Sequence, residues 1–315
     1  MSATDQPQPE WPPGPLWILR VATVFLFAAR GFLYLTNHGP LSVFFWNQDW
    51  LEVGVFRFLG LDWETYAANS EVVILSTQKS MGWLFISAAA VACFVSPTRN
   101  RWASGVVLGG AVFLIPYWLL AWVETDYRLP MFLEHFLQWM TPLLLVGYGR
   151  LPRMLWCGLA WLAVSCTFVG HGHYAIGLGV PVTNDYINLC IAILHCNADT
   201  AKTLLAWVGW VDLALPVLIL LPWLRVPALG YMALWGVMTA IARIVGHWTP
   251  AEDYYGLHPW LAEAIVRLPH GLVPLTLLVL LVASRKSVKG WKKIRVWKNP
   301  RKADECGPVG SRTAG

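Results

Sequence analysis

Long apolar runs recur along this chain of 315 residues, and each is long enough to cross a lipid bilayer. Crossing a hydrocarbon core of about 30 Å takes roughly 20 mostly apolar residues in an α-helix. Runs of this length lie near residues 15–35, 79–96, 102–123, 133–148, 154–170, 203–222, 227–247 and 262–283. The sequence therefore predicts an all-α membrane protein with about eight transmembrane helices.

The composition favours a lipid environment over an aqueous one. Hydrophobic residues make up 57% of the chain and charged residues 13%, whereas soluble domains carry roughly 25% charged residues. The chain also contains 20 tryptophans, and indole rings concentrate at the two headgroup layers of a membrane. We therefore expect the lipid bilayer to be the main partner of this chain.

The basic residues of the short loops fall on one side of the predicted bundle. They are Arg20, Arg99, Arg101, Arg150, Arg153 and Arg225. The loops of the other side are rich in aspartate and glutamate. Because lysine and arginine are retained in cytoplasmic loops, we expect a multi-pass protein with both termini in the cytoplasm. Residues 1–14 are polar and proline-rich, and we expect them to form a disordered cytoplasmic N-terminus.

A basic segment, residues 285–315, follows the last apolar run and accounts for the net charge of +5. Its lysines and arginines alternate with Trp291, Val296 and Trp297. Such a segment beside a membrane helix is typical of an anchor attracted to anionic lipids of the inner leaflet. We therefore expect a basic cytoplasmic tail and no nucleic-acid partner.

An internal repeat divides the apolar part into residues 15–150 and 151–284. The offset, which is the number of residues between matched positions of the two halves, is shortest in the second and third helices, where Ser87 pairs with Asp212. The offset is longer in the fourth helix, where Pro142 pairs with Pro274, and longest in the first, where Arg30-Gly31 pairs with His171-Gly172. Since each half has an even number of spans, we expect two four-helix bundles of parallel orientation.

The outer loop of the first half, residues 36–78, is aromatic and acidic. We expect it to lie on the membrane surface as one or two short amphipathic helices. A docking surface for a soluble partner fits the same pattern.

Ionisable residues inside predicted spans are costly in lipid and are therefore candidates for function. In the second half these candidates are Asp212, Arg243, His247, Glu263, Arg267 and His270. We expect Asp212 to contact Arg243, with Arg267 as the competing partner, and a purely structural ion pair is the alternative. In the first half Arg30 is buried in a span, but the repeat places Ser87, Trp118 and Trp122 opposite Asp212, Arg243 and His247. The polar site is therefore expected in the second half.

Two histidines, His171 and His173, lie in the segment GHGHYAIG after the predicted helix 154–170. On a helix they would face apart, so joint metal binding requires extended backbone, which Gly170 and Gly172 permit. No spacing matches a known ligand motif, and we expect these histidines to hydrogen-bond to one another or to acids rather than to bind a metal.

Cys190 and Cys196 lie in one predicted outer loop. Disulfides persist on that side of a membrane. A bridge between them and two free thiols on a membrane-dipping helix both fit the sequence.

Each half resembles the DoxX-like family of prokaryotic four-helix membrane proteins. Arg20 and Gly31 match an arginine and a glycine of the family's first helix, and Asp212 after Gly209 matches the acidic residue of its second helix. Ser87 departs from the pattern in the first half. The resemblance implies a location in the prokaryotic inner membrane. It also implies a kinship with membrane subunits of oxidoreductases, including thiosulfate:quinone oxidoreductase.

These features favour a membrane subunit of an oxidoreductase complex, associated with quinone or sulfur redox chemistry at an outward-side pocket. Proton exchange is assigned to Asp212, His247 and His270. Substrate binding is assigned to Arg30, His171, His173, Arg243, Glu263 and Arg267. No flavin, nicotinamide or iron–sulfur motif is evident, so a redox partner protein would supply electrons.

Two alternatives remain open. One is a non-catalytic scaffold or receptor that recruits an extracytoplasmic partner through the aromatic loop, and the other is a carrier of small anions. A quinone site requires a pocket between the last four spans, lined by histidine and acid and open to lipid.

Overall fold

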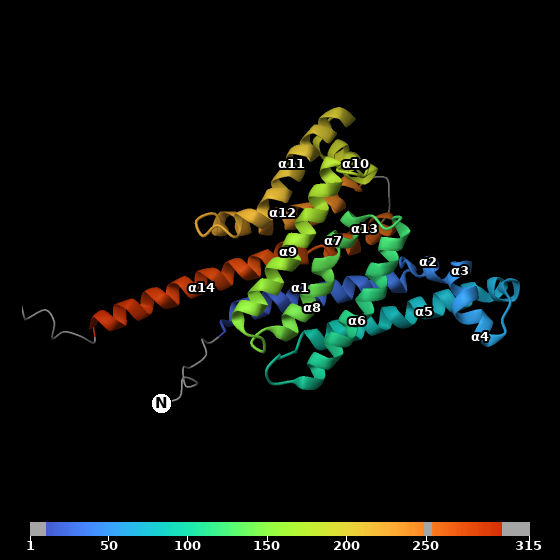
Figure 1. Cartoon of the computed structure of the whole chain (residues 1–315), viewed down its shortest axis with the longest axis horizontal. Coiled ribbons are helices and arrows are strands. Elements are labelled where there is room, and N and C mark those ends of the chain that lie inside the picture. Colours follow the sequence, from blue (N-terminus) through green and yellow to red (C-terminus); the bar gives the residue numbers. More distant parts are fainter. Residues whose placement is uncertain (1–10, 249–253, 298–315) are drawn as a thin grey trace, which may run out of the picture.

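The computed structural model describes residues 11–248 and 254–297, and within them every regular element is helical (Figure 1). The first half contains α1 (Pro13–Leu35), α2 (Leu41–Phe45), α3 (Gln48–Leu51), a π-helix (Glu52–Phe56), α4 (Arg57–Leu59), α5 (Trp63–Ala92), α6 (Arg101–Glu124), α7 (Leu129–Glu134) and α8 (Phe136–Gly147). The second half contains α9 (Arg153–Ile176), α10 (Asn184–Leu194), α11 (Ala198–Leu218), α12 (Arg225–Gly246), α13 (Tyr254–Val266) and α14 (Pro269–Trp297). The all-α prediction is confirmed.

Six helical segments of the described chain are long and apolar enough to cross a membrane. They are Pro13–Leu35, Arg101–Glu124, Arg153–Ile176, Ala198–Leu218, Arg225–Gly246 and His258–Arg285. The other two expected spans do not reach this standard. Residues 79–96 fall largely in α5, whose first half is polar, and residues 133–148 are divided between α7 and α8 at His135. A total of eight spans remains a prediction.

The first residues and the first loop differ from expectation. Trp11 packs edge-on against Tyr148, with ring centroids 4.5 Å apart, and the Tyr148 hydroxyl donates to the Pro12 carbonyl at 2.6 Å. Residues 11–14 are therefore ordered, while residues 1–10 lie outside the described part. The aromatic loop ends at residue 62 rather than 78, because Asp62 caps α5 by accepting from the Thr65 amide.

Paired glycines bring the first two helices of each half into backbone contact. A Cβ atom at Gly31 of α1 would lie 2.9 Å from the Gly82 carbonyl oxygen of α5. A Cβ atom at Gly172 of α9 would lie 2.8 Å from the Gly209 carbonyl oxygen of α11. Small residues at such crossings are the usual means of close helix packing in membranes. The repeat therefore has a structural counterpart in its first two helices.

These contacts also correct the register of the repeat. They make Gly82 the counterpart of Gly209, because each glycine meets the glycine of the preceding long helix. Asp212 lies about one helical turn after Gly209, and the same step from Gly82 leads to Phe85, which is fully buried. Asp212 therefore corresponds to Phe85 and not to Ser87. The pairing of Ser87 with Asp212 is wrong by about half a helical turn.

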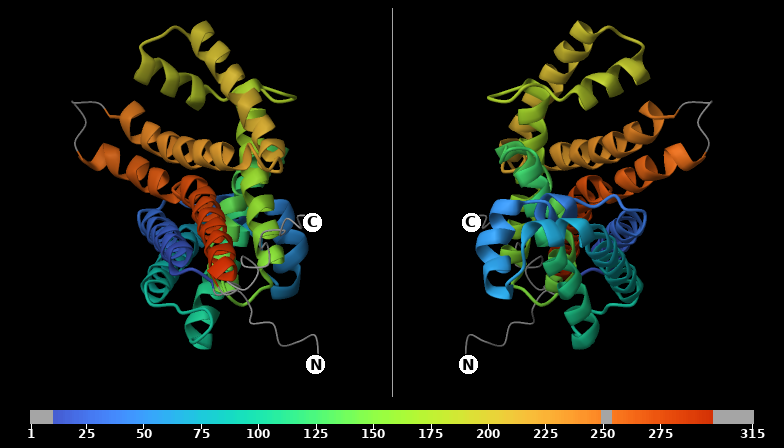
Figure 2. Two further views of the ribbon diagram at one scale, coloured as in Figure 1. Left: turned by 90° about the vertical axis from the view of Figure 1, so that its left-hand side faces the viewer. Right: turned by 90° about the vertical axis from the view of Figure 1, so that its right-hand side faces the viewer.

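The two halves do not form separate bundles. α1 packs against α13 and α14 as well as α5, and α9 packs against α7 and α8 as well as α11. One apolar core runs through both halves, from Leu19 in α1 to Leu280 in α14. In Figure 2, α10 to α12 lie on one side of this core, and α5 and α6 lie on the opposite side. The first helix of each half thus packs against the last helices of the other half.

Substituting Gly172 by Ala tests the backbone contact. We expect the variant to lose about 1–3 kcal/mol of stability, because the added methyl group must push α9 and α11 apart. Gly158→Ala on the same helix is the matched control, since nothing lies within 4 Å of a Cβ atom there. The control should unfold at the wild-type temperature or above it, given the better helix propensity of alanine. Thermal unfolding in detergent checks both, and equal midpoints would contradict the contact.

Candidate functional site

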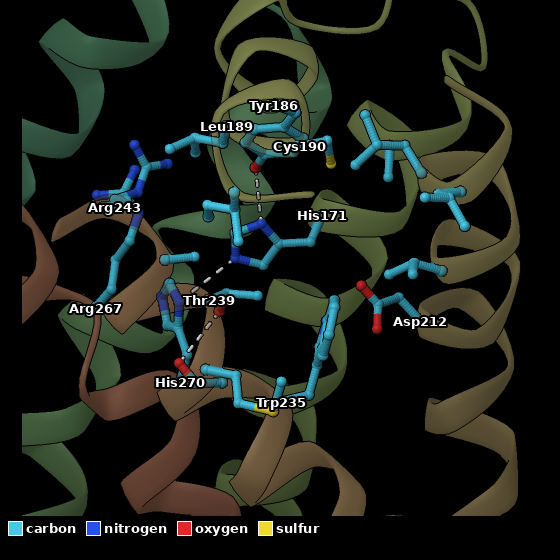
Figure 3. A pocket seen from close by; sticks show the side chains of 18 of the residues that line it. His171, Tyr186, Leu189, Cys190, Asp212, Trp235, Thr239, Arg243, Arg267 and His270 are labelled. Atoms are coloured by element: carbon cyan, nitrogen blue, oxygen red, sulfur yellow. Dashed lines mark hydrogen bonds between the residues drawn. The ribbon is translucent and has the colours of Figure 1, made fainter. Parts of the chain in front are cut away.

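A cavity of about 370 Å³ lies in the second half, enclosed by α9, α10, α11, α12 and α14 (Figure 3). Its walls are mostly apolar. The polar side chains among its lining residues are His171, Tyr186, Asp212, Thr239, Arg243, Arg267 and His270. This volume lies at the lower end of the range of small-molecule pockets. The cavity lies between helices of the second half and is lined by histidine and acid, two of the features that a quinone site requires.

The polar end of the cavity is placed by a break between α7 and α8. The Leu137 amide cannot complete the helix and donates to the Thr167 hydroxyl of α9 at 3.1 Å. α7 approaches α9 closely, because a Cβ atom at Gly170 would lie 2.7 Å from the Glu134 backbone nitrogen. The Glu134 side chain, 7% exposed, is therefore carried into the space between the halves.

Two arginines and two glutamates form a buried ion network between the halves. The Arg267 guanidinium donates to the Glu263 carboxylate at 2.6 Å and lies 3.7 Å from the Glu134 carboxylate. Arg30 of α1 lies 3.6 Å from Glu263 and donates to the Gln138 side-chain oxygen at 2.8 Å. Each of these four charges has a partner of opposite sign, as buried charges require.

A chain of hydrogen-bonding side chains leads from this network into the cavity (Figure 3). The Tyr186 hydroxyl donates to the Glu134 carboxylate at 3.3 Å and lies 3.0 Å from His171 Nδ1. His171 Nε2 lies 3.4 Å from His270 Nδ1. Burial raises the pKa of Tyr186, so its phenol stays neutral and can both donate and accept. The four groups form one continuous path.

The same two positions are in contact in each half. The offset that pairs Gly31 with Gly172 also relates Arg30 to His171, and the offset of the fourth helix relates Gln138 to His270. Arg30 donates to Gln138, and His171 contacts His270. The repeat therefore extends to the polar groups, with an arginine–glutamine pair in one half and a histidine pair in the other.

The contact expected between Asp212 and Arg243 is not formed. The two residues lie on opposite walls of the cavity (Figure 3). Asp212 is 2% exposed, its Oδ1 atom has no hydrogen-bond partner, and the Trp235 side chain is the donor beside its carboxyl group. Arg267, the competing partner, is held by Glu263 and Glu134 instead.

Two of the expected histidines lie outside the cavity wall. The His247 ring stacks on Trp260 with centroids 3.5 Å apart, and its Nδ1 lies 2.8 Å from the Arg243 carbonyl oxygen. His173 precedes the end of α9, where its carbonyl accepts from the Gly177 amide. The backbone is helical through Ile176, so His171 and His173 point to different sides of α9. The glycines beside them serve close packing rather than extended backbone.

The two cysteines are free thiols in this structure. Cys190 lies within α10 and lines the cavity, whereas Cys196 follows the end of that helix. The Cys196 sulfur lies 3.7 Å from the Cys190 carbonyl oxygen. The bridge considered from sequence is not formed here.

The first half contributes more to the site than its sequence suggested. Glu134 joins the ion network to the hydrogen-bonded chain, and Arg30 neutralises Glu263.

Tyr186 of the second half supplies the link between Glu134 and His171. The only signal for Glu134 in the sequence was its position at the start of a predicted span, and Tyr186 carried no signal.

Glu134 and Asp212 are both buried carboxyl groups, and their substitution should have opposite effects. Glu134→Gln removes a partner of Arg267 and should cost about 3 kcal/mol, because it leaves a buried charge less compensated. Asp212→Asn removes a carboxyl group that has no ion pair among the described residues, so stability should stay equal or rise. Unfolding midpoints of the two variants in one detergent check this contrast, and a larger loss for Asp212→Asn would contradict the assignment of partners.

Comparison with known proteins finds no match for this chain. No protein-family model matches it, and neither does any curated protein or solved structure. The function proposed below therefore rests on the residues of the site and their geometry.

Proposed function

We propose that this protein is a membrane subunit that binds a lipid-soluble redox carrier, a quinone, in the cavity of its second half. The observation that carries the proposal is the combination of an apolar cavity with a hydrogen-bonded chain at its inner end. A quinone has a polar ring head and an apolar chain, and both parts have a matching environment here.

The mouth of the cavity supports entry from lipid. Three lining residues on three helices are exposed, namely Leu194 of α10, Leu204 of α11 and Met238 of α12. Trp207 and Trp210 on the neighbouring surface of α11 are exposed as well. An apolar rim of this kind is favourable in a bilayer, and it admits an apolar molecule without passage through water.

The polar groups support proton exchange at the bound ring. Reduction of a quinone to a quinol takes two electrons and two protons. His171 keeps 20% of its side chain exposed and connects through Tyr186 to Glu134, so it can pass protons between the cavity and the ion network. In this proposal His171 takes the role expected of His247, and His270 keeps the role in proton exchange that the sequence assigned to it. The electrons come from a partner oxidoreductase.

A scaffold role has one specific observation in its favour. Trp46, Trp50 and Phe58 of the aromatic loop are exposed by 51%, 40% and 86%. These side chains can lie in a membrane surface or against an extracytoplasmic protein. The anion carrier is less well supported, because the ionisable groups that line the cavity are not followed by others along α14 as far as Ser284.

Filling the cavity tests the proposed function. Ala242→Phe places a ring in the cavity wall, whereas Ile241→Phe, one residue earlier, adds a ring to a surface that is 50% exposed. Wild-type protein and Ile241→Phe should retain native quinone through purification, bind added decylubiquinone and unfold at a higher temperature with it. Ala242→Phe should lose both effects.

Lipid extraction, an ultraviolet–visible spectrum and thermal unfolding measure these outcomes. Quinone-free wild-type protein whose unfolding temperature is unchanged by decylubiquinone would overturn the proposal.

A further inference from the structure

Arg243 is a buried cation without a direct partner of opposite charge. The residue is 9% exposed, and its side chain takes part in none of the ion pairs or side-chain hydrogen bonds of the described residues. A guanidinium group keeps its positive charge in proteins. Burial of such a charge without compensation is costly, so its presence here requires an explanation.

The neighbouring carboxylates of Glu134 and Glu263 act on Arg243 only at longer range and form no ion pair with it. The space between the halves contains Arg30, Arg243 and Arg267 against the two carboxylates of Glu134 and Glu263. Arg30 and Arg267 form direct ion pairs with these two carboxylates. One positive charge is left over, and it belongs to Arg243.

The unpaired guanidinium faces the cavity. Gly236, Thr239 and Arg243 lie on one face of α12, and all three line the cavity. Figure 3 labels Thr239 and Arg243 among the lining side chains. The Thr239 hydroxyl donates to the Gly236 carbonyl, which leaves the Arg243 head as the free donor of this wall. No nitrogen of the Arg243 side chain is among the buried polar atoms without a partner in the described residues, and Arg243 lines the cavity.

Asp212 does not neutralise Arg243, because it lies on the opposite wall (Figure 3). A carboxyl group can also lose its charge by taking up a proton, whereas a guanidinium cannot give one up. The unmatched charge of the cavity is therefore positive.

We propose that the cavity selects an amphipathic oxyanion: an apolar body that ends in a delocalised negative group, held by Arg243. The planar guanidinium fork matches two oxygens of such a group. Leu189, Leu205 and Val208 line the cavity around the apolar body. An acyl chain with a carboxylate and a ring-headed lipid in its ionised form share this chemistry. The proposal rests on the proposed function only in taking the same cavity as a binding site for a lipid-soluble molecule, and it adds a preference for negative charge.

Matched pairs of probes test the charge preference in nanodiscs of uncharged lipid. Dodecanoate is compared with methyl dodecanoate, and an ionised 2-hydroxy-3-alkyl-naphthoquinone is compared with its 2-methoxy derivative. Native mass spectrometry measures binding of each probe. At least one ionised probe should bind about tenfold or more tightly than its neutral partner, as expected for a charge-assisted hydrogen bond. The pair that shows the larger preference identifies the source of the oxyanion.

Variants of Arg243 show whether the preference arises from this side chain. Arg243→Gln should abolish it, and Arg243→Lys should keep part of it, since lysine retains the charge but not the fork. Arg101→Gln removes the same charge from an exposed position on α6 and should leave binding unchanged. Without ligand, Arg243→Gln should unfold at the wild-type temperature or above it.

Equal affinity of the ionised and neutral probes would overturn this proposal, and so would a preference that survives in Arg243→Gln. If decylubiquinone binds while the ionised probes have no advantage, the proposed function stands and the charge selection falls. If the ionised probes bind through Arg243 and no quinone binds, the charge selection stands and the quinone role falls.

Discussion

The carboxylate of Glu134 is the contact on which the arrangement of the second half depends. It lies at the end of α7, and its two oxygens reach groups on three other parts of the fold: Tyr186 of α10, His171 of α9 and Arg267 between α13 and α14. Water cannot supply these partners within a lipid-embedded core. Elements that are distant in sequence are therefore fixed relative to one another by one buried charge.

The glutamate near the last helices of each half contacts the first helix of the other half. Glu263 of the second half pairs with Arg30 in the first helix of the first half. Glu134 of the first half contacts His171, the counterpart of Arg30 in the second half. Each half thus completes the charges of the other. The helices that carry these charges are also in contact: α1 packs on α13 and α14, and α9 packs on α7 and α8.

The long apolar runs and their spacing were enough to predict an all-helical chain and most of its long helices. Helix formation and lipid burial depend on local composition, which the sequence states directly. The surroundings of Asp212 and Arg243 could not be predicted from local composition. Helical periodicity shows which side chains share a face, but it does not show which helix lies opposite. The break at His135 was missed for a similar reason, because it depends on Thr167 of another helix.

The cavity lies in the second half because of how the helices of that half are spaced. In the first half α5 packs directly on α6, whereas α11 and α12 barely touch and α10 packs on both. The repeated helices are therefore packed directly together in the first half, whereas they are separated by the cavity in the second half. The closely packed first half can favour rigidity, whereas the residues that line the cavity of the second half can change. Leu189 and Ile193 of α10 line the cavity and lie outside the shared apolar core, so substitutions there would change the cavity wall without altering a residue of that core.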